Sequence, residues 1–199
     1  MDQQTASHTK QAKTDLFQSH DYYAIDELLN EDHILARDAV RAWVKQEVSP
    51  IIEDYANRAE CPVHLFKGLG EIGAFGPSIP AEYGGGGMDE IAYGIIMAEL
   101  ERGDSGLRSM ASVQGSLVMF PIYKFGSEEQ KRKYLPKLAT GEFIGCFGLT
   151  EPDHGSNPAG METNIVDDGD HYILNGAKMW ITNSPLADIA VVWARDQDG

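Results

Sequence analysis

Three glycines, Gly68, Gly70 and Gly73, have the G-x-G-x-x-G spacing that lets a dinucleotide pyrophosphate approach the start of a helix. A working site of this kind needs a buried strand before the glycines and a βαβ unit around them. Here the preceding segment begins at Pro62, and the sequence on both sides has helical periodicity. We therefore interpret the glycines as small residues at which two helices, or a helix and a loop, pack closely.

Several other kinds of chemistry lack their usual residues. The chain has no Gly-x-Ser-x-Gly elbow and no Gly-Lys-Ser/Thr phosphate loop, and its six histidines show no metal-ligand spacing. Its two cysteines, Cys61 and Cys146, form no Cys-x-x-Cys pair, so neither a disulfide framework nor a zinc site is expected. This cysteine usage fits a reducing compartment, and we predict a cytoplasmic protein.

Two segments carry a specific resemblance. Residues 146–156 read CFGLTEPDHGS, and residues 175–183 read NGAKMWITN; they are preceded by ELERGDSGLRS and YKFGSEEQKRKYLPKLATGE. Together, over about residues 30–199, the sequence resembles the acyl-CoA dehydrogenase family, especially its glutaryl-CoA dehydrogenase-like branch. The resemblance implies a helical N-terminal domain, a β-barrel middle domain and a C-terminal helical bundle, with FAD and acyl-CoA held among them.

The resemblance assigns one set of residues to the FAD site: Phe147, Leu149, Thr150, Ser156, Trp180, Ile181 and Thr182. It places Leu149 and Thr150 against the pyrimidine edge of the flavin, and a strand end suits this role because its backbone groups and a hydroxyl are free to donate or accept. An alternative is that Thr150 closes a turn into Glu151 and Pro152.

Trp180 and Thr182 form the second part of the expected flavin site. The resemblance lays the Trp180 indole along the isoalloxazine and the Thr182 hydroxyl near flavin N5. Residues two apart on a strand share a face, so both could reach the flavin while Ile181 points into the barrel. Without the resemblance, this sequence would read as an ordinary half-buried strand.

Arg108, Ser109 and Ser156 are the expected acyl-CoA contacts. Arg108 and Ser109 are predicted near the start of a helix, where a guanidinium and free backbone N–H groups suit an anionic or carbonyl-bearing ligand. Ser156 follows Gly155 in a turn-rich segment that permits close approach of the thioester and the cofactor phosphates. The alternative for Arg108 is a salt bridge with an acidic neighbour such as Asp104.

For the complete enzyme, the resemblance implies α,β-desaturation of an acyl-CoA with hydride transfer to FAD. The family's base is a glutamate on the C-terminal bundle, and no residue here corresponds to it, so we predict an inactive fragment. Val63 stands where the glutaryl branch has an arginine, which favours an apolar or short acyl chain, although Arg58 is near. A flavin oxidase or hydroxylase of the same fold, and a non-catalytic helical interaction module, are the alternatives.

The elements that must position these residues fall into two regions. Helical stripes run from Ile34 past a break at Pro50, from Pro62 to about Ile72, and through Ile91–Leu100 and Val113–Ile122; a capping box at Ser127–Gln130 opens another helix. The segment 76–87 is a glycine-rich loop. After Gly141 come four β-rich runs, FIGCFGLT, HYILNG, KMWITN and ADIAVVWA, which we expect to form antiparallel strands.

The expected fold class is therefore α+β. We predict a disordered tail at residues 1–20, a helical domain at 21–141 and a truncated part of an antiparallel β-barrel at 142–199. The tail has neither the apolar segment of a secretory signal nor the arginines of a transit peptide.

Charge and hydropathy limit the partners. The net charge of −15, without any run of Lys or Arg, argues against nucleic-acid binding, and no stretch approaches the roughly 20 apolar residues of a membrane span. The resemblance implies an electron-transfer flavoprotein as electron acceptor and a homotetramer for the full-length protein.

Overall fold

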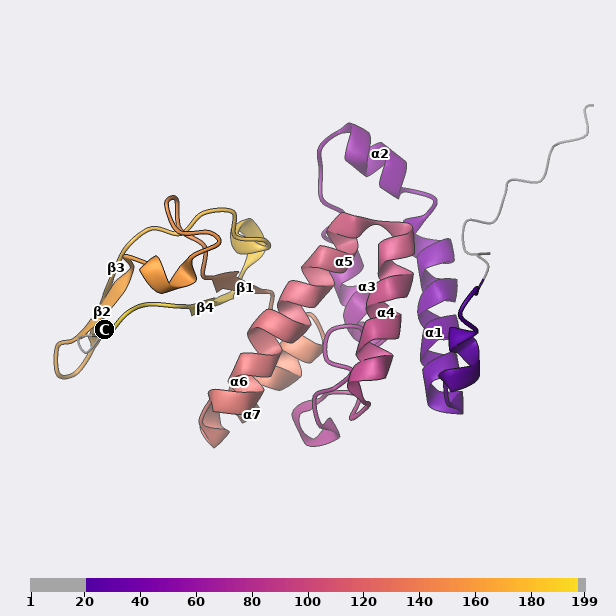
Figure 1. Ribbon diagram of the computed structural model, residues 1–199, viewed down its shortest axis with the longest axis horizontal. Coiled ribbons are helices and arrows are strands. Elements are labelled where there is room, and N and C mark those ends of the chain that lie inside the picture. Colours follow the sequence, from indigo (N-terminus) through magenta and orange to yellow (C-terminus); the bar gives the residue numbers. More distant parts are fainter. Residues whose placement is uncertain (1–20, 197–199) are drawn as a thin grey trace, which may run out of the picture.

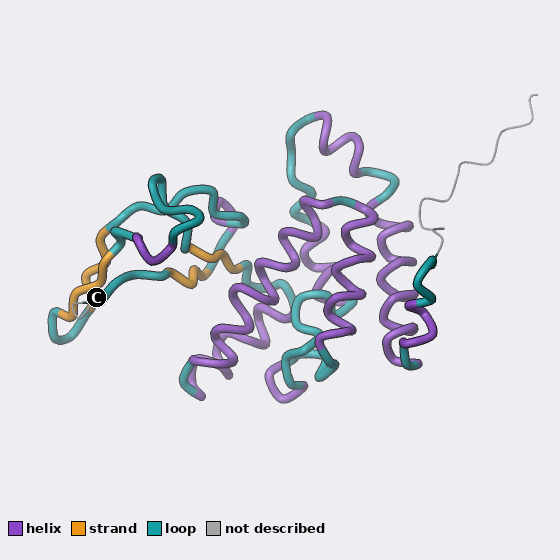
Figure 2. Tube along the Cα trace, in the orientation of Figure 1, coloured by secondary structure: helices purple, strands orange, loops and turns teal. Residues whose placement is uncertain are grey.

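The computed structural model describes residues 21–196, so the tail expected at residues 1–20 lies outside the described residues. Helices come first and short strands follow, which confirms the α+β class (Figures 1 and 2). The α-helices are α1 (Glu31–Trp43), α2 (Ile52–Asn57), α3 (Leu65–Glu71), α4 (Glu90–Gly103), α5 (Ser105–Ser112), α6 (Phe120–Phe125) and α7 (Glu128–Ala139). The strands are β1 (Gly145–Gly148), β2 (Asn164–Asp167), β3 (Tyr172–Asn175) and β4 (Ile189–Val192).

Side-chain caps set the helix starts. Asn30 caps α1 by accepting a hydrogen bond from the His33 N–H at 2.9 Å, and the predicted capping box of Ser127 with Gln130 opens α7. Asp104 separates α4 from α5, because its side chain accepts from the Leu107 N–H at 2.7 Å. Each cap satisfies an N–H that has no partner inside the helix.

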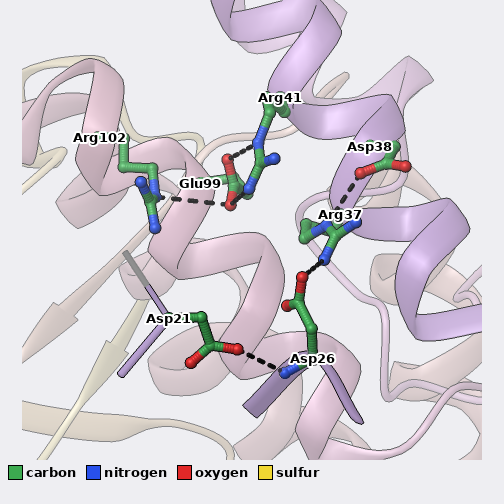
Figure 3. Close-up of polar contacts among 7 residues, drawn as sticks. All are labelled: Asp21, Asp26, Arg37, Asp38, Arg41, Glu99 and Arg102. Atoms are coloured by element: carbon green, nitrogen blue, oxygen red, sulfur yellow. Dashed lines mark hydrogen bonds and ion pairs between the residues drawn. The ribbon is translucent and has the colours of Figure 1, made fainter. Parts of the chain in front are cut away.

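Helix α1 packs lengthwise against α4, and a buried ion pair lies between them (Figure 3). The Glu99 carboxylate is almost fully buried in α4, and it accepts from Nε and Nη2 of Arg41 at 2.8 and 2.7 Å. Arg102 adds a longer contact of 3.5 Å. A buried carboxylate requires such partners, so this contact fixes the register of the two helices.

A nearly continuous rod of helix crosses the centre of the molecule (Figure 1). Helices α5 and α6 are joined by a π-helical segment, Val113–Met119, which packs on both α7 and β1. The wider π turn rotates the predicted apolar stripe, so that Val118 is buried while Leu117 is 37% exposed.

Of the G-x-G-x-x-G glycines, Gly68 and Gly70 lie on α3 and their packing role is confirmed, whereas Gly73 follows the helix with a φ of 72° and nothing within 4 Å of where a Cβ would be. A Cβ at Gly68 would come within 2.9 Å of the Trp43 ring, and one at Gly70 within 2.2 Å of the Thr140 carbonyl oxygen. The missing side chains therefore let α3 approach both α1 and the end of α7.

The β region departs from the predicted pattern in three ways. Strands β2 and β3 are antiparallel, but β1 and β4 pair in parallel, with Gly145 opposite Ile189. Strand β2 was not predicted, and the expected strand KMWITN is a bend and turn because Trp180 and Asn183 have φ angles of 58° and 68°. Parallel pairing is possible because a long connection, the segment between Gly148 and Ile189, separates β1 from β4.

Candidate functional site

The two motif segments meet at Thr150. The Thr150 carbonyl, just beyond the end of β1, accepts a hydrogen bond from the Met179 N–H at 2.9 Å. The neighbouring Lys178 ammonium donates to the Leu149 carbonyl at 3.0 Å. Residues far apart in sequence, Leu149 and Thr150 on one side and Trp180 on the other, are thus held next to each other.

Glu151 stabilises this junction between the two motif segments. Only 5% exposed, its carboxylate accepts from the N–H groups of Glu162 and Thr163 at 2.6 and 2.9 Å and from Lys178 at 2.8 Å. These backbone hydrogen bonds, first that of Glu162, and the Lys178 ammonium hold the pKa of Glu151 far below its usual range. Sequence reasoning missed Glu151 and Lys178, although both lie inside the segments that carry the resemblance.

Thr150 also precedes a turn, as the alternative interpretation anticipated. The backbones of Glu151 and His154 exchange hydrogen bonds of 3.2 and 3.3 Å. Ser156 is exposed in the same loop, and a Cβ at Gly155 would lie 4.0 Å from the Thr150 Cγ2 atom. The loop therefore brings Gly155, the residue before Ser156, close to Thr150.

Trp180 stands out from the surface with 85% of its area exposed. Its φ of 58° is in the left-handed region, where a bulky residue is strained by about 1–3 kcal/mol. The prediction that Trp180 and Thr182 share the face of a strand was wrong, since the segment turns instead of extending. Ile181 is half-buried, and its carbonyl closes the following turn by accepting from the Ser184 N–H at 3.2 Å.

Phe147 occupies a different environment from the loop residues. It lies within β1 opposite Val191, half-buried, and its ring meets the Trp193 ring edge-on at 6.3 Å between centroids. This side chain is committed to packing between β1 and β4.

Arg108 is already engaged. Its Nε donates to Glu101 Oε2 at 2.7 Å and its Nη1 to Ser112 Oγ at 3.3 Å, so the salt-bridge alternative holds with Glu101 as partner in place of Asp104. The hydrogen bonds from Arg108 and Ser105 lower the pKa of Glu101. The prediction of a free backbone N–H at Arg108 was wrong, because this N–H donates to the Asp104 carbonyl at the start of α5.

Ser109 and Thr182 line one groove of about 370 Å³. Its apolar wall comes from α2 and α5, through Ile52, Ala56, Leu107 and Met110, and its polar side chains include Glu60 and Asp104. Among the described residues, those that line this groove include no Lys or Arg. The groove therefore brings Ser109, a predicted substrate contact, and Thr182, a predicted flavin contact, into one mainly apolar space whose lining includes two acidic residues.

Arg58 and Val63 do not line this groove, although Glu60 and Pro62, which are close to them in sequence, do. The Arg58 guanidinium pairs with Glu60 at 2.9 Å and covers the Tyr55 ring at 4.8 Å from its centroid. The Arg58 side chain is therefore already held by Glu60 and Tyr55.

Residues 21–196 contain neither a candidate membrane-spanning helix nor a candidate metal-binding cluster. No helix in that part of the chain is long and apolar enough to cross a membrane. Nor does it contain a group of three or more His, Cys, Asp or Glu side chains arranged to hold a metal ion.

The described residues form a helical domain followed by short strands, with two loop segments that meet at Thr150. Comparison with known proteins identifies the family that has this arrangement. The family model described as acyl-CoA dehydrogenase, N-terminal domain, matches residues 30–142, and the acyl-CoA dehydrogenase middle domain matches residues 146–199. The chain belongs to the acyl-CoA dehydrogenase family.

Individual members of this family are similar to the chain over most of its length. A crystal structure of a glutaryl-CoA dehydrogenase from Mycobacterium smegmatis in complex with FADH2 is 51% identical, with a TM-score of 0.86 over 89% of this chain and 46% of that one. The probable acyl-CoA dehydrogenase YngJ of Bacillus subtilis (strain 168) is 40% identical over 86% of this chain and 46% of its own length. A chain in the structure of the electron transferring flavoprotein of Acidaminococcus fermentans is 40% identical, with a TM-score of 0.81, over 83% of this chain and 44% of that one. The chain spans about half the length of these relatives.

Proposed function

We propose that residues 21–141 and 142–199 form the N-terminal domain and part of the middle domain of an FAD-dependent acyl-CoA dehydrogenase of the glutaryl-CoA dehydrogenase-like branch. The observation that carries the proposal is the junction at Thr150, where the two motif segments converge beside an exposed indole. The change from helix to strand between Ala139 and Gly145 supports the division.

The residues present fit an isoalloxazine ring. An indole that is 85% exposed on a strained backbone gains nothing from the fold itself, whereas a flat ring stacked on it would bury both surfaces. Leu149 and Thr150 would face the polar edge of such a ring, and Thr182 would face its reactive side. Phe147 and Ile181 would support these contacts from beneath, and Ser156 would lie towards the cofactor phosphates and the thioester.

The groove between Ser109 and Thr182 is the proposed place for the acyl group. Its apolar wall suits a short hydrocarbon chain, and the Asp104 carboxylate would repel a distal carboxylate, whereas that of Glu60 is paired with Arg58. Arg58 is already paired, so it does not supply the missing positive charge. We infer a preference for an uncharged acyl chain over glutaryl, with Arg108 near the thioester end.

The chemistry that FAD supplies when bound is hydride acceptance at N5 during α,β-desaturation of an acyl-CoA. This chain would hold and orient the reactants and keep water from the ring. The resemblance places the glutamate base on the C-terminal bundle, so we propose that these 199 residues alone are inactive. For the whole protein we propose a cytoplasmic homotetramer that passes electrons to an electron-transfer flavoprotein.

An absorbance titration with FAD tests the proposal. It is made on this chain and on a hybrid completed with the C-terminal part of the Mycobacterium smegmatis relative, and butyryl-CoA is added afterwards. We expect tight flavin binding and bleaching by butyryl-CoA in the hybrid only. Turnover by the chain alone would contradict the inactivity, and a hybrid without bound flavin would contradict the function.

A further inference from the structure

Gln114 is fully buried in the π-helical segment, and it uses its whole amide. Its Nε2 donates to the carbonyls of Leu138 and Phe143 at 2.9 and 2.7 Å, and its Oε1 accepts from the Gly145 N–H at 2.7 Å. Two carbonyls and one N–H leave a single way to orient the amide. One side chain of the central rod thereby ties the end of α7 to the start of β1.

Asn183 holds Gly145 from the other side. Its Nδ2 donates to the Gly145 carbonyl at 3.2 Å and to the Met110 carbonyl of α5 at 3.3 Å. The residue is buried and has a φ of 68°, a left-handed conformation that asparagine tolerates. A single side chain thus joins the turn after Thr182 to both the rod and β1.

Gly145 is therefore held at both of its backbone groups by side chains. A Cβ at this position would come within 2.5 Å of Val118 Cγ1, so only glycine allows β1 to lie this close to the rod. Gly145 begins the four-residue strand that leads to Leu149 and Thr150, and Asn183 directly follows Thr182. Both predicted flavin-contacting segments are anchored at this one point.

We propose that Gln114 and Asn183 are positioning residues for the flavin site: together they fix Gly145 on the central rod, and so align Thr150 and Thr182 with Ser109 on α5. This inference rests on the proposed function. Its physical basis is that loss of the Gln114 amide removes the side-chain partners of the Phe143 carbonyl and the Gly145 N–H, and loss of the Asn183 amide removes that of the Gly145 carbonyl. The segments can then reach other partners by moving away from the rod.

The test uses Gln114→Met, which keeps the side-chain length but removes all three hydrogen bonds, and Asn183→Gly, which keeps the left-handed backbone but removes the amide. Both are made in the hybrid chain. FAD affinity is followed by the quenching of flavin fluorescence, and folding by near-ultraviolet circular dichroism and the thermal midpoint. Val44→Ala is the matched control, because it opens a cavity in the core near Gly103, away from Gly145.

We expect each variant to weaken FAD binding by about tenfold, and the double variant to lose less than the product of the two, since both act through Gly145. Val44→Ala should lower the thermal midpoint while FAD affinity stays within about twofold. Variants that bind FAD no worse than Val44→Ala at a comparable midpoint would overturn the positioning role. An unsubstituted hybrid that binds no FAD would instead overturn the proposed function on which the role rests.

Discussion

At the scale of single residues, a substitution of Trp180 should affect FAD binding without affecting folding stability. An 85% exposed indole on a left-handed backbone contributes little to the fold, and glycine adopts a φ of 58° without strain. We expect Trp180→Gly to change the free energy of unfolding by less than about 1 kcal/mol, because the relief of backbone strain is offset by the greater freedom of glycine in the unfolded chain. FAD binding by the hybrid should weaken by about tenfold or more. Chemical denaturation and FAD titration measure the two effects; Val44→Ala, which opens a cavity in the helical core, should do the reverse. A large loss of stability in Trp180→Gly would show that the indole serves the fold.

Glu151 makes a pH-dependent contribution to the free energy of unfolding. Its pKa is lowered in the folded state, so the unfolded chain binds the proton more readily, and the contribution is present above about pH 4.3 and declines as pH falls below it. We expect the stability difference between the wild type and Glu151→Gln to be full at pH 7 and to shrink towards pH 3. Urea unfolding across this range measures it, with the exposed Glu142→Gln as control. A difference that stayed constant with pH would mean that the carboxylate charge is not what matters.

At the scale of elements, the ion pair of Arg41 with Glu99 decides how α1 sits on α4 (Figure 3). Within residues 21–196, removal of Arg41 would leave the buried carboxylate with the longer Arg102 contact alone, so Arg41→Leu should destabilise the chain by about 2–3 kcal/mol. The double change with Glu99→Leu should recover much of that loss, because both charges are then gone. Arg37→Leu on the same helix is the control, and it should cost less than about 1 kcal/mol since Asp26 and Asp38 are exposed. Urea denaturation of the four chains distinguishes these outcomes.

The same scale shows what could be predicted from the sequence. The helices follow from local rules, a capping side chain and an apolar stripe, so the box at Ser127 was predictable. The Trp-Ile-Thr segment has high β-propensity, yet a backbone hydrogen bond to Thr150 and left-handed residues turn it, and these depend on distant partners. The parallel pairing of β1 with β4, and the roles of Gln114 and Glu151, likewise depend on contacts across the fold. For this reason the motifs predict where the candidate site lies, whereas the residues that anchor its two segments could be identified only from the structure.

At the scale of the whole molecule, the proposed acyl-CoA substrate is anionic and the chain is acidic, so we expect the local charge around the acyl group to decide which acyl-CoA is preferred. The net charge is −15, and the polar side chains of the groove include Glu60 and Asp104. The Glu60 carboxylate is paired with Arg58, so a distal carboxylate would meet the like charge of Asp104 there. The methyl end of a butyryl group would instead meet Ile52 and Leu107. We therefore expect the hybrid to favour butyryl-CoA over glutaryl-CoA by about tenfold or more in kcat/KM.

Val63→Arg tests the cause of that preference. Val63 is exposed beside Pro62, a residue that lines the groove, so an arginine at position 63 could reach a distal carboxylate without filling the core. We expect glutaryl-CoA to gain at least about fivefold in kcat/KM and butyryl-CoA to change little, because only the former carries the second charge. Val63→Met, which adds length without charge, is the matched control. Equal gains for both substrates, or a wild-type hybrid that already prefers glutaryl-CoA, would place the acyl end somewhere other than this groove.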